Sequence, residues 1–424
     1  MRAAARRTLA FTLLMCLTGS AAWPATFIHG PYSGAPSADS ITIGWEADAV
    51  VAARVEYGLR DVFEANGTLP EVVLVPAPME ESSDTTHIAL AGLPTQADYA
   101  YRVVLEAAEE EIASEIGFFR TAPDPGTPVS FAVIADTQWQ SEATNPLELV
   151  GNAIAADPTP FDFILHAGDV IESPSSYYWD HWFASFADML RRAPFIPVLG
   201  NHEKNHRSYY EAFSLPPGAG KNDEQWWALH WGDVVVVGLD TNVSRVADYH
   251  AQQDWARAHL SGPEPHKFVI FHHPVFSSDA FHGSGYSYDL IYHPIFVEHG
   301  VDIVFNGHAH NYERLERDGV TYLVVGGGGA TPRGLADEHV PESILALEGH
   351  YFYARVVASQ AAIDVDVLSV ATEPVDGGRL ALESRRLDSF TVGEPQPKSF
   401  EIPWILLGIV AAGAAILLFR RIAN

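Results

Sequence analysis

The chain has 424 residues, more than one domain usually holds, and 47% of them are hydrophobic, so at least two domains with sizeable cores are expected. Its 54 acidic residues outnumber the 25 basic ones, which gives a formal net charge of −29 at pH 7. A charge of this sign and size repels nucleic-acid phosphates and anionic lipid surfaces, and it excludes general nucleic-acid binding as a function.

The N-terminal segment has the pattern of an export signal. The apolar run TLAFTLLMCLTGSAA (8–22) follows Arg2, Arg6 and Arg7 and ends in small residues. Because the run is too short to span a membrane, this pattern predicts a secretory signal peptide over residues 1–22. The only cysteine, Cys16, lies within it. The exported chain is therefore expected to have no thiol, which excludes disulfides and thiolate chemistry.

The first domain is predicted to be all-β and to cover residues 27–122. Alternating apolar and polar residues at 39–47, 53–58, 87–93 and 99–107 are typical of short, half-buried strands in a small sandwich. The stretch TAPDPGTP (121–128), rich in proline and glycine, predicts a linker to the next domain.

The second domain is predicted to be α/β and to cover residues 129–390. Six apolar runs recur between residues 129 and 308: VSFAVIAD, FDFILHAGD, PFIPVLGN, DVVVVGLD, HKFVIFHH and VDIVFNGH. Their near-continuous apolarity indicates strands buried on both faces. Helical patterns at 179–192 and 252–260 lie between them, and further alternating strands are expected at 349–370.

Polar side chains follow these buried runs at the points where the strands should end. They are Asp136, Asp169, Asn201, His272, His308 and His310. Ligand sites of α/β sheets lie at the carboxyl ends of the strands, so we expect these side chains along one edge of one sheet. An extended conformation would point the two imidazoles of His308 and His310 the same way.

The six residues predict a metal centre. Oxygen and nitrogen ligands without sulfur suit zinc, iron or manganese. Six ligands exceed the needs of one tetrahedral zinc and match two ions that share a bridging carboxylate, a role expected of Asp169. Two ions about 3.5–4 Å apart can bind a phosphoryl oxygen and activate a water together.

At these residues the chain resembles the calcineurin-like metallophosphoesterase superfamily and, within it, the purple acid phosphatases. The matching blocks are ADTQ (135–138), GDVIE (168–172), GNHE (200–203), VIFH (269–272) and GHAHNYER (307–314). The trailing NYER is typical of the purple acid phosphatase branch, and residues 27–122 resemble its N-terminal fibronectin-type-III-like domain. The resemblance implies a metallophosphoesterase β-sandwich flanked by helices and preceded by that all-β domain.

The resemblance also implies roles for individual residues. Asp136, Asp169 and His310 would hold the first metal, and Asp169 would bridge to a second one held by Asn201, His272 and His308. His202 would face the substrate as a general acid, and His282 would contact the substrate phosphate or else be a solvated loop histidine. Glu203 would be an anchor behind the ligands or a catalyst.

The chain departs from the purple family at the first metal. Glu172 stands where the family has the tyrosine that ligates ferric iron, and the first block reads Asp136-Thr137-Gln138 where related branches have Asp-x-His. Glu172 as a carboxylate or Gln138 through its amide oxygen could complete the site, and a role of Glu172 outside the ligand set is equally open. Without a phenolate, ferric iron loses a preferred ligand, so a colourless protein with divalent ions is expected.

The implied function is hydrolysis of small phosphomonoesters. A phosphodiesterase or nucleotidase with the same site is one alternative, and a non-catalytic surface protein that binds partners is another. At the C-terminus, residues 391–401 are predicted to be a polar linker, and the apolar run at 402–419 reaches about 27 Å as a helix, enough to span a membrane. An exported periplasmic or cell-surface enzyme, tethered by this helix, is expected; removal of the run as a sorting tail is the alternative.

Overall fold

The structure is a computed structural model, and it describes residues 25–49, 51–77, 85–107, 110–138, 145–285, 287–373 and 380–393. The predicted signal peptide (1–22) and C-terminal apolar segment (402–419) lie outside these residues. Among the described residues, no helix has both the length and the apolar character needed to cross a membrane.

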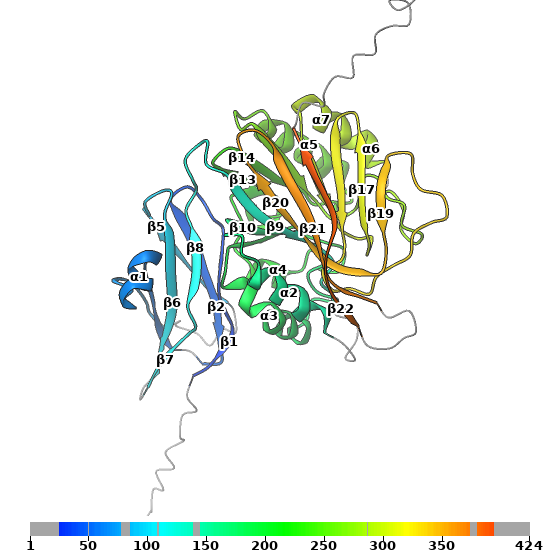
Figure 1. Ribbon diagram of the computed structural model, residues 1–424. Coiled ribbons are helices and arrows are strands. Elements are labelled where there is room, and N and C mark those ends of the chain that lie inside the picture. The colour runs from blue at the N-terminus through cyan, green and yellow to red at the C-terminus, as the bar shows by residue number, and fades with distance from the viewer. Residues whose placement is uncertain are drawn as a thin grey trace, which may run out of the picture.

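The N-terminal domain is a sandwich of two small antiparallel sheets (Figure 1). One sheet has the order β1-β2-β5 and consists of Phe27–Gly34, Ser40–Ala47 and Thr86–Ala91. The other joins β4, β3, β6, β7 and β8, which are Glu71–Val75, Ala52–Leu59, Asp98–Glu106, Glu111–Ala113 and Gly117–Arg120. The four predicted strands are confirmed. Helix α1 (Arg60–Asn66) was not predicted, because it has seven residues and buries none of them, and so it carries no apolar stripe.

The second domain contains two sheets that face each other. The first is six-stranded, in the order β11-β10-β9-β20-β21-β22: Phe195–Pro197, Phe163–His166, Val129–Ile134, His350–Ala358, Ile363–Thr372 and Ala381–Val392. The second is eight-stranded, in the order β12-β13-β14-β15-β16-β18-β17-β19: Gly218–Ala219, Trp226–Trp231, Val234–Gly238, His266–Ile270, Ile303–Asn306, Val320–Val325, Tyr312–Arg317 and Ser343–Leu347.

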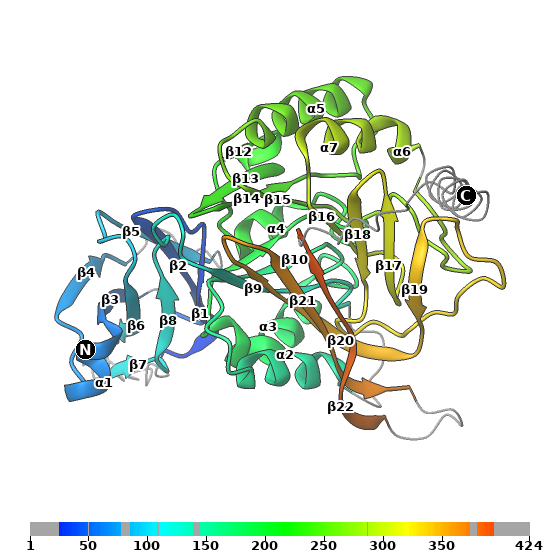
Figure 2. The same cartoon turned by 45° about the horizontal axis from the view of Figure 1, so that its top comes forward.

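Helices cover the outer faces of the two sheets (Figure 2). Helices α2 (Pro146–Ala156) and α3 (Ser176–Leu190) lie on the side of the six-stranded sheet. The eight-stranded sheet carries the others: α5, α6 and α7, which are Val246–Leu260, Tyr288–Ile291 and His293–His299. A short helix, α4 (Arg207–Ala212), follows the loop after β11, and a 3₁₀ turn spans Lys221–Asp223. The predicted helices are confirmed, and α5 begins six residues before its predicted start at residue 252.

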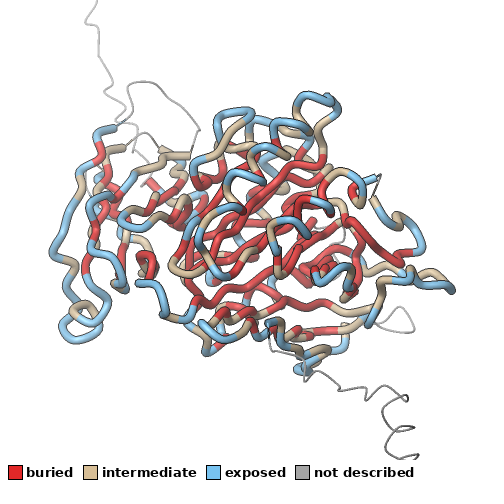
Figure 3. The backbone as a smooth tube through the Cα atoms, turned by 90° about the horizontal axis from the view of Figure 1, so that it is seen from above, coloured by how far each residue is buried: buried red, intermediate tan, exposed pale blue. Residues whose placement is uncertain are grey.

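The core explains the continuous apolar runs. In β15, Phe268 and Ile270 face the space between the sheets, whereas Val269 packs into the cluster beneath the outer helices. The rings of Phe131 in β9 and Phe268 meet edge-to-face across the sheets at a centroid distance of 5.2 Å. Strands between two apolar layers need apolar residues on both faces. The buried backbone of both sheets is visible as the red centre of Figure 3.

Two expectations from the sequence are corrected here. The strands that precede the polar residues belong to two sheets: β9, β10 and β11 to the six-stranded one and β15 and β16 to the eight-stranded one. The apolar pattern shows that a strand is buried but not which sheet it joins. The predicted linker at 391–401 begins too early, because β22 pairs with β21 through Val392.

The two domains meet through β1 and α3. His29 in β1 lies between two carboxylates, 2.9 Å from Glu46 of its own domain and 2.8 Å from Asp180 in α3. Its ring stacks on Phe183 of α3 at a centroid distance of 4.4 Å. These contacts hold the first domain on the α3 side of the second, outside the metal centre described next.

Candidate metal centre

The site lies where the parallel strands of both sheets end. Strands β9, β10 and β11 run parallel to one another, as do β14, β15 and β16. The loops after these strands therefore meet at one edge of the sandwich, and they carry all six predicted ligand residues: Asp136, Asp169, Asn201, His272, His308 and His310. The structure brings all six together.

Buried carboxylates and one imidazole form the centre of the site. Asp136, Asp169 and His272 are all buried, and they offer ligand atoms that lie within 4.8 Å of one another. The Oδ2 of Asp169 is 3.1 Å from the Nε2 of His272, and the Oδ1 of Asn201 is also 3.1 Å from that Nε2. Burial alone would raise the pKa of Asp169, but the positive charge and hydrogen bond of His272 hold it well below its ordinary value.

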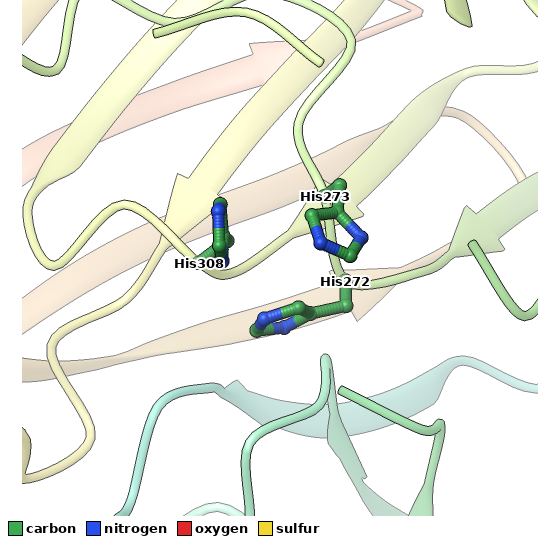
Figure 4. A group of neighbouring side chains, drawn as sticks. All are labelled: His272, His273 and His308. Atoms are coloured by element: carbon green, nitrogen blue, oxygen red, sulfur yellow. The ribbon is translucent and has the colours of Figure 1, made fainter. Parts of the chain in front are cut away.

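Three imidazoles gather beside this centre (Figure 4). His272, His273 and His308 offer nitrogens within 4.8 Å of one another, and the rings of His273 and His308 have a centroid distance of 4.5 Å. Burial and the charge of His272 lower the pKa of His273 to about 3, so it stays neutral at physiological pH. His273 was not predicted as part of the site, although the His-His pair at the end of HKFVIFHH was a signal for it.

The second histidine of the GHAH block lies against the other carboxylate. The Nε2 of His310 is 3.5 Å from the Oδ1 of Asp136. The expectation that His308 and His310 lie in an extended segment is wrong, because they belong to a bend after β16 and His308 has φ 68°. The bend allows one histidine to join the imidazole cluster while the other joins Asp136.

The hydrogen bonds of the histidines favour metal ligation. The Nδ1 of His272 donates to the carbonyl of Ala167 at 2.9 Å, and that of His310 donates to the carbonyl of Thr331 at 2.8 Å. A ring whose Nδ1 carries the proton presents the lone pair of Nε2, and this arrangement is usual for metal-binding histidines.

Backbone strain is concentrated in the same residues. Asp136, Asp169 and His308 have φ values of 57°, 56° and 68°, in the left-handed region that non-glycine residues seldom adopt. Such conformations cost free energy and persist where the surrounding structure holds a functional site in place.

Gln138 is the residue whose contacts test whether a cation fits. It is fully buried, and its Oε1 finds no hydrogen-bond partner among the residues that the structure describes. Its Nε2 is 3.1 Å from the Nε2 of His310 and 3.4 Å from the Oδ2 of Asp169. The side chain of Gln138 thus combines a buried amide oxygen without a donor with a nitrogen that contacts a carboxylate and an imidazole, and such an oxygen suits a hard or borderline cation. The donor set therefore fits the metal ions that the sequence predicts.

Glu203 of the GNHE block supports Asp169 from behind. The carboxylate of Glu203 is fully buried and accepts the backbone N–H groups of Gly200, Asp169 and Ile171 at 2.7, 3.1 and 3.2 Å. Burial and the nearby Asp169 charge raise the pKa of Glu203 to about 7. Glu203 thus anchors the ligand loops, which is one of the two roles left open by the sequence.

Replacing Gly200 with alanine is expected to disturb the bridging carboxylate. A Cβ on Gly200 would lie 2.1 Å from both the backbone N and the Oδ1 of Asp169, far inside van der Waals contact. We expect the affinity for metal to fall by at least about tenfold, which is the loss usually seen when a group that orients a metal ligand is removed. Calorimetric titration of the metal-free variant with metal ions measures this affinity. Alanine at Gly67, where a Cβ meets no atom within 4 Å, should leave the affinity unchanged. An unchanged affinity in the Gly200 variant would contradict the packing described here.

His202 lies at the accessible side of the site, with its side chain a quarter exposed. Its Nδ1 donates to the carbonyl oxygen of Glu172 at 2.7 Å and lies 3.7 Å from the Glu172 carboxylate, while its Nε2 is 3.8 Å from the Oδ2 of Asp169. Glu172, the residue in the position of the family's tyrosine, therefore contacts the predicted general acid.

His282 also reaches the site from its loop. Its ring centroid is 3.9 Å from that of His308. The Oδ1 of Asp279 accepts the backbone N–H groups of Phe281 and His282 at 2.9 and 2.7 Å, and its Oδ2 accepts from Asn311 at 3.1 Å. Burial, followed by the charge of Arg333, lowers the pKa of His282. Arg333 was not identified from the sequence, because no motif includes it.

Comparison with known proteins agrees with this geometry. Residues 129–312 match the family model for calcineurin-like phosphoesterases. Purple acid phosphatase 1 of Ipomoea batatas is 26% identical over 283 residues, which cover 62% of this chain and 58% of the relative, so the chain spans a little over half of that protein's length.

Two solved structures share the fold. A purple acid phosphatase from yellow lupin (Lupinus luteus) has a TM-score of 0.69 and 18% identity over 86% of this chain and 74% of its own. A structure of PhoD has a TM-score of 0.63 and 14% identity over 87% of this chain and 92% of its own. Residues 129–312 thus match the calcineurin-like phosphoesterase family, and the chain is similar to a purple acid phosphatase over 62% of its length.

Proposed function

We propose that the protein is a metal-dependent phosphatase that hydrolyses small phosphomonoesters. The observation that carries the proposal is the convergence of the six predicted ligand residues, from loops of two sheets, on one buried site with His202 beside it. Strained backbone and clustered buried carboxylates and imidazoles cost free energy, and such an arrangement is typical of a functional site rather than of an inert scaffold.

The proposed ligand assignment has two halves. Asp136, Asp169 and His310 would hold the first ion. The second would be held by Asp169, Asn201, His272 and His308, with iron, zinc or manganese as the candidate metals. When bound, the pair of ions supplies Lewis acidity that neutralises phosphoryl oxygens and favours ionisation of the water nucleophile. The chain contributes rigid loops, a buried low-dielectric setting and the proton transfer described next.

His202 is the proposed proton donor to the leaving oxygen. Its Nδ1 is held by the Glu172 carbonyl, which leaves Nε2 directed toward the Asp169 side of the site. A proton held at Nε2 would lie on the Asp169 side of the site, where it could pass to the leaving oxygen. We propose that the Glu172 carbonyl orients the His202 ring.

The absence of a tyrosine in the position of Glu172 predicts the colour of the protein. We expect purified, metal-loaded protein to be colourless, because no phenolate is available there for charge transfer to ferric iron. A visible absorption spectrum, taken together with metal analysis, tests this. A strong visible charge-transfer band in metal-analysed protein would contradict it.

One experiment tests the proposed function. The purified protein is analysed for metal content and assayed with 4-nitrophenyl phosphate and bis(4-nitrophenyl) phosphate. We expect close to two metal ions per chain and a higher kcat/KM for the monoester. Preference for the diester would favour the phosphodiesterase alternative, and metal-loaded protein inactive on both would favour a binding role.

We further propose that the protein is exported and held at the membrane by residues 402–419. The proposal rests on the basic and apolar pattern of residues 1–22 and on the apolar run that ends in Arg420 and Arg421. Cell fractionation of the full chain and of a chain ending at residue 393 tests it. The full chain should be in the membrane fraction and the shortened chain should not; equal distribution would reject the tether.

A further inference from the structure

Arg333 lies at the rim of the metal centre. Its backbone N–H donates to the carbonyl of His310 at 2.9 Å, so it is tied directly to a predicted ligand residue. The chain beside it pairs with the loop that carries His282, because Ala280 N–H donates to the carbonyl of Gly334 at 3.0 Å and Asp279 forms a bridge with Leu335. Residues 279–282 and 333–335 therefore form one continuous edge of the site, called the rim here, which carries both His282 and Arg333.

The guanidinium of Arg333 has a buried nitrogen that no acceptor in the described part of the chain contacts. Its Nη1 is buried without a hydrogen-bond partner, and within the described ranges no carboxylate forms an ion pair with Arg333. Its Cζ lies 5.2 Å from the ring centroid of Phe281, a contact that orients the guanidinium plane but accepts no hydrogen bond. A buried cationic donor without an acceptor costs free energy that a bound anion offsets.

Arg333 is not among the groups proposed to surround the phosphoryl group that is hydrolysed. The proposed groups around that phosphoryl group are the metal ligands, His202 and His282. Arg333 is held over Phe281, whose side chain is 78% exposed and so marks the outer part of the rim. The protein has a net charge of −29, and Arg333 has no ion-pair partner among the described residues, so its charge can attract an anionic group of the substrate.

We propose that Arg333 binds a second anionic group of the substrate, so that the preferred substrates are phosphomonoesters whose leaving group carries its own phosphate or carboxylate. This inference rests on the proposed function for the orientation of the substrate. Arg333 is the specificity-determining residue, and Phe281 positions its guanidinium.

Binding to the metal-loaded full chain tests the inference without turnover. Calorimetry compares a phosphonate analogue of AMP, whose single phosphorus group is joined through carbon and cannot be hydrolysed, with α,β-methylene-ADP, whose second phosphate group cannot be cleaved from the first. We expect wild type to bind the methylene compound at least about tenfold more tightly, the lower range for a hydrogen bond to a charged group. Arg333→Met should abolish this ratio, and Arg333→Lys should keep part of it because the charge remains.

Arg317 provides a matched control. Its Cζ also lies 5.2 Å from a phenylalanine ring, that of Phe276, but it stands at the far end of β17, away from the site, and pairs with Glu342. Arg317→Met should preserve the ratio. If Arg333→Met does not fold, the affinity ratio of Arg333→Lys tests the inference, and this ratio should be lower than that of wild type.

Three results would overturn the inference: no preference in wild type, an unchanged ratio in the Arg333 variants, or equal weakening of both ligands. These are distinct from failure of the proposed function. A protein that shows the preference and hydrolyses no phosphomonoester rejects the function alone, whereas an active phosphatase without the preference rejects the inference alone.

Discussion

Asp169→Asn is expected to lower phosphatase activity by more than about 10³-fold, because the two metal ions lose the carboxylate they would share. An amide offers one neutral oxygen, so it cannot bridge two cations as a carboxylate does. Asp169 also accepts the backbone N–H of His202 through Oδ1 and faces His272 through Oδ2, so the substitution affects both halves of the site. The measurements are kcat/KM with 4-nitrophenyl phosphate and metal content per chain.

Asp162→Asn is the matched control for this substitution. Asp162 is equally buried and directly precedes β10, the strand whose other end leads to Asp169. Its Oδ2 accepts the backbone N–H of Ser130 at 2.8 Å, at the end of the sheet away from the site. We expect this variant to keep both metal ions and its activity. Full activity in the Asp169 variant would reject the shared-ligand assignment.

His202→Ala is expected to lower kcat by about 10²–10⁴-fold while metal content changes little. His202 is not among the six proposed ligands; it contacts the site through its hydrogen bond to Glu172 and its approach to Asp169. Removal of the ring therefore removes a proton donor but leaves the ligand set complete. Single-turnover rates and metal analysis of the same preparation separate the two effects.

The leaving group provides a second readout for His202. A substrate with an acidic leaving group, such as 4-nitrophenyl phosphate, needs less protonation than an alkyl phosphate, so the variant should lose more activity on the alkyl ester. His206→Ala is the control, since His206 lies in the same segment and caps α4 by accepting from Ser208 N–H. Loss of metal from the His202 variant, with equal losses on both substrates, would make His202 a structural residue.

The sequence alone determined the kinds of residues at the site and their places at strand ends. Short, near-continuous apolar runs are typical of strands buried on both faces, and a polar residue just beyond such a strand lies at the edge of the sheet. Asp136, Asp169, Asn201, His272, His308 and His310 followed from that pattern together with the resemblance. The all-β first domain followed from alternating residues, whose period of two is a local property of a strand.

Only the tertiary structure decided which parts of the chain meet. It divided the ligand-bearing strands between two sheets, and it set the left-handed φ of His308 that separates this residue from His310. It placed the buried Gln138 against Asp169 and His310, and Glu172 against His202. Arg333 joined the rim because its loop pairs with residues more than fifty positions earlier in the chain. Local patterns report burial and period, whereas these contacts depend on long-range packing, which no short stretch of sequence contains.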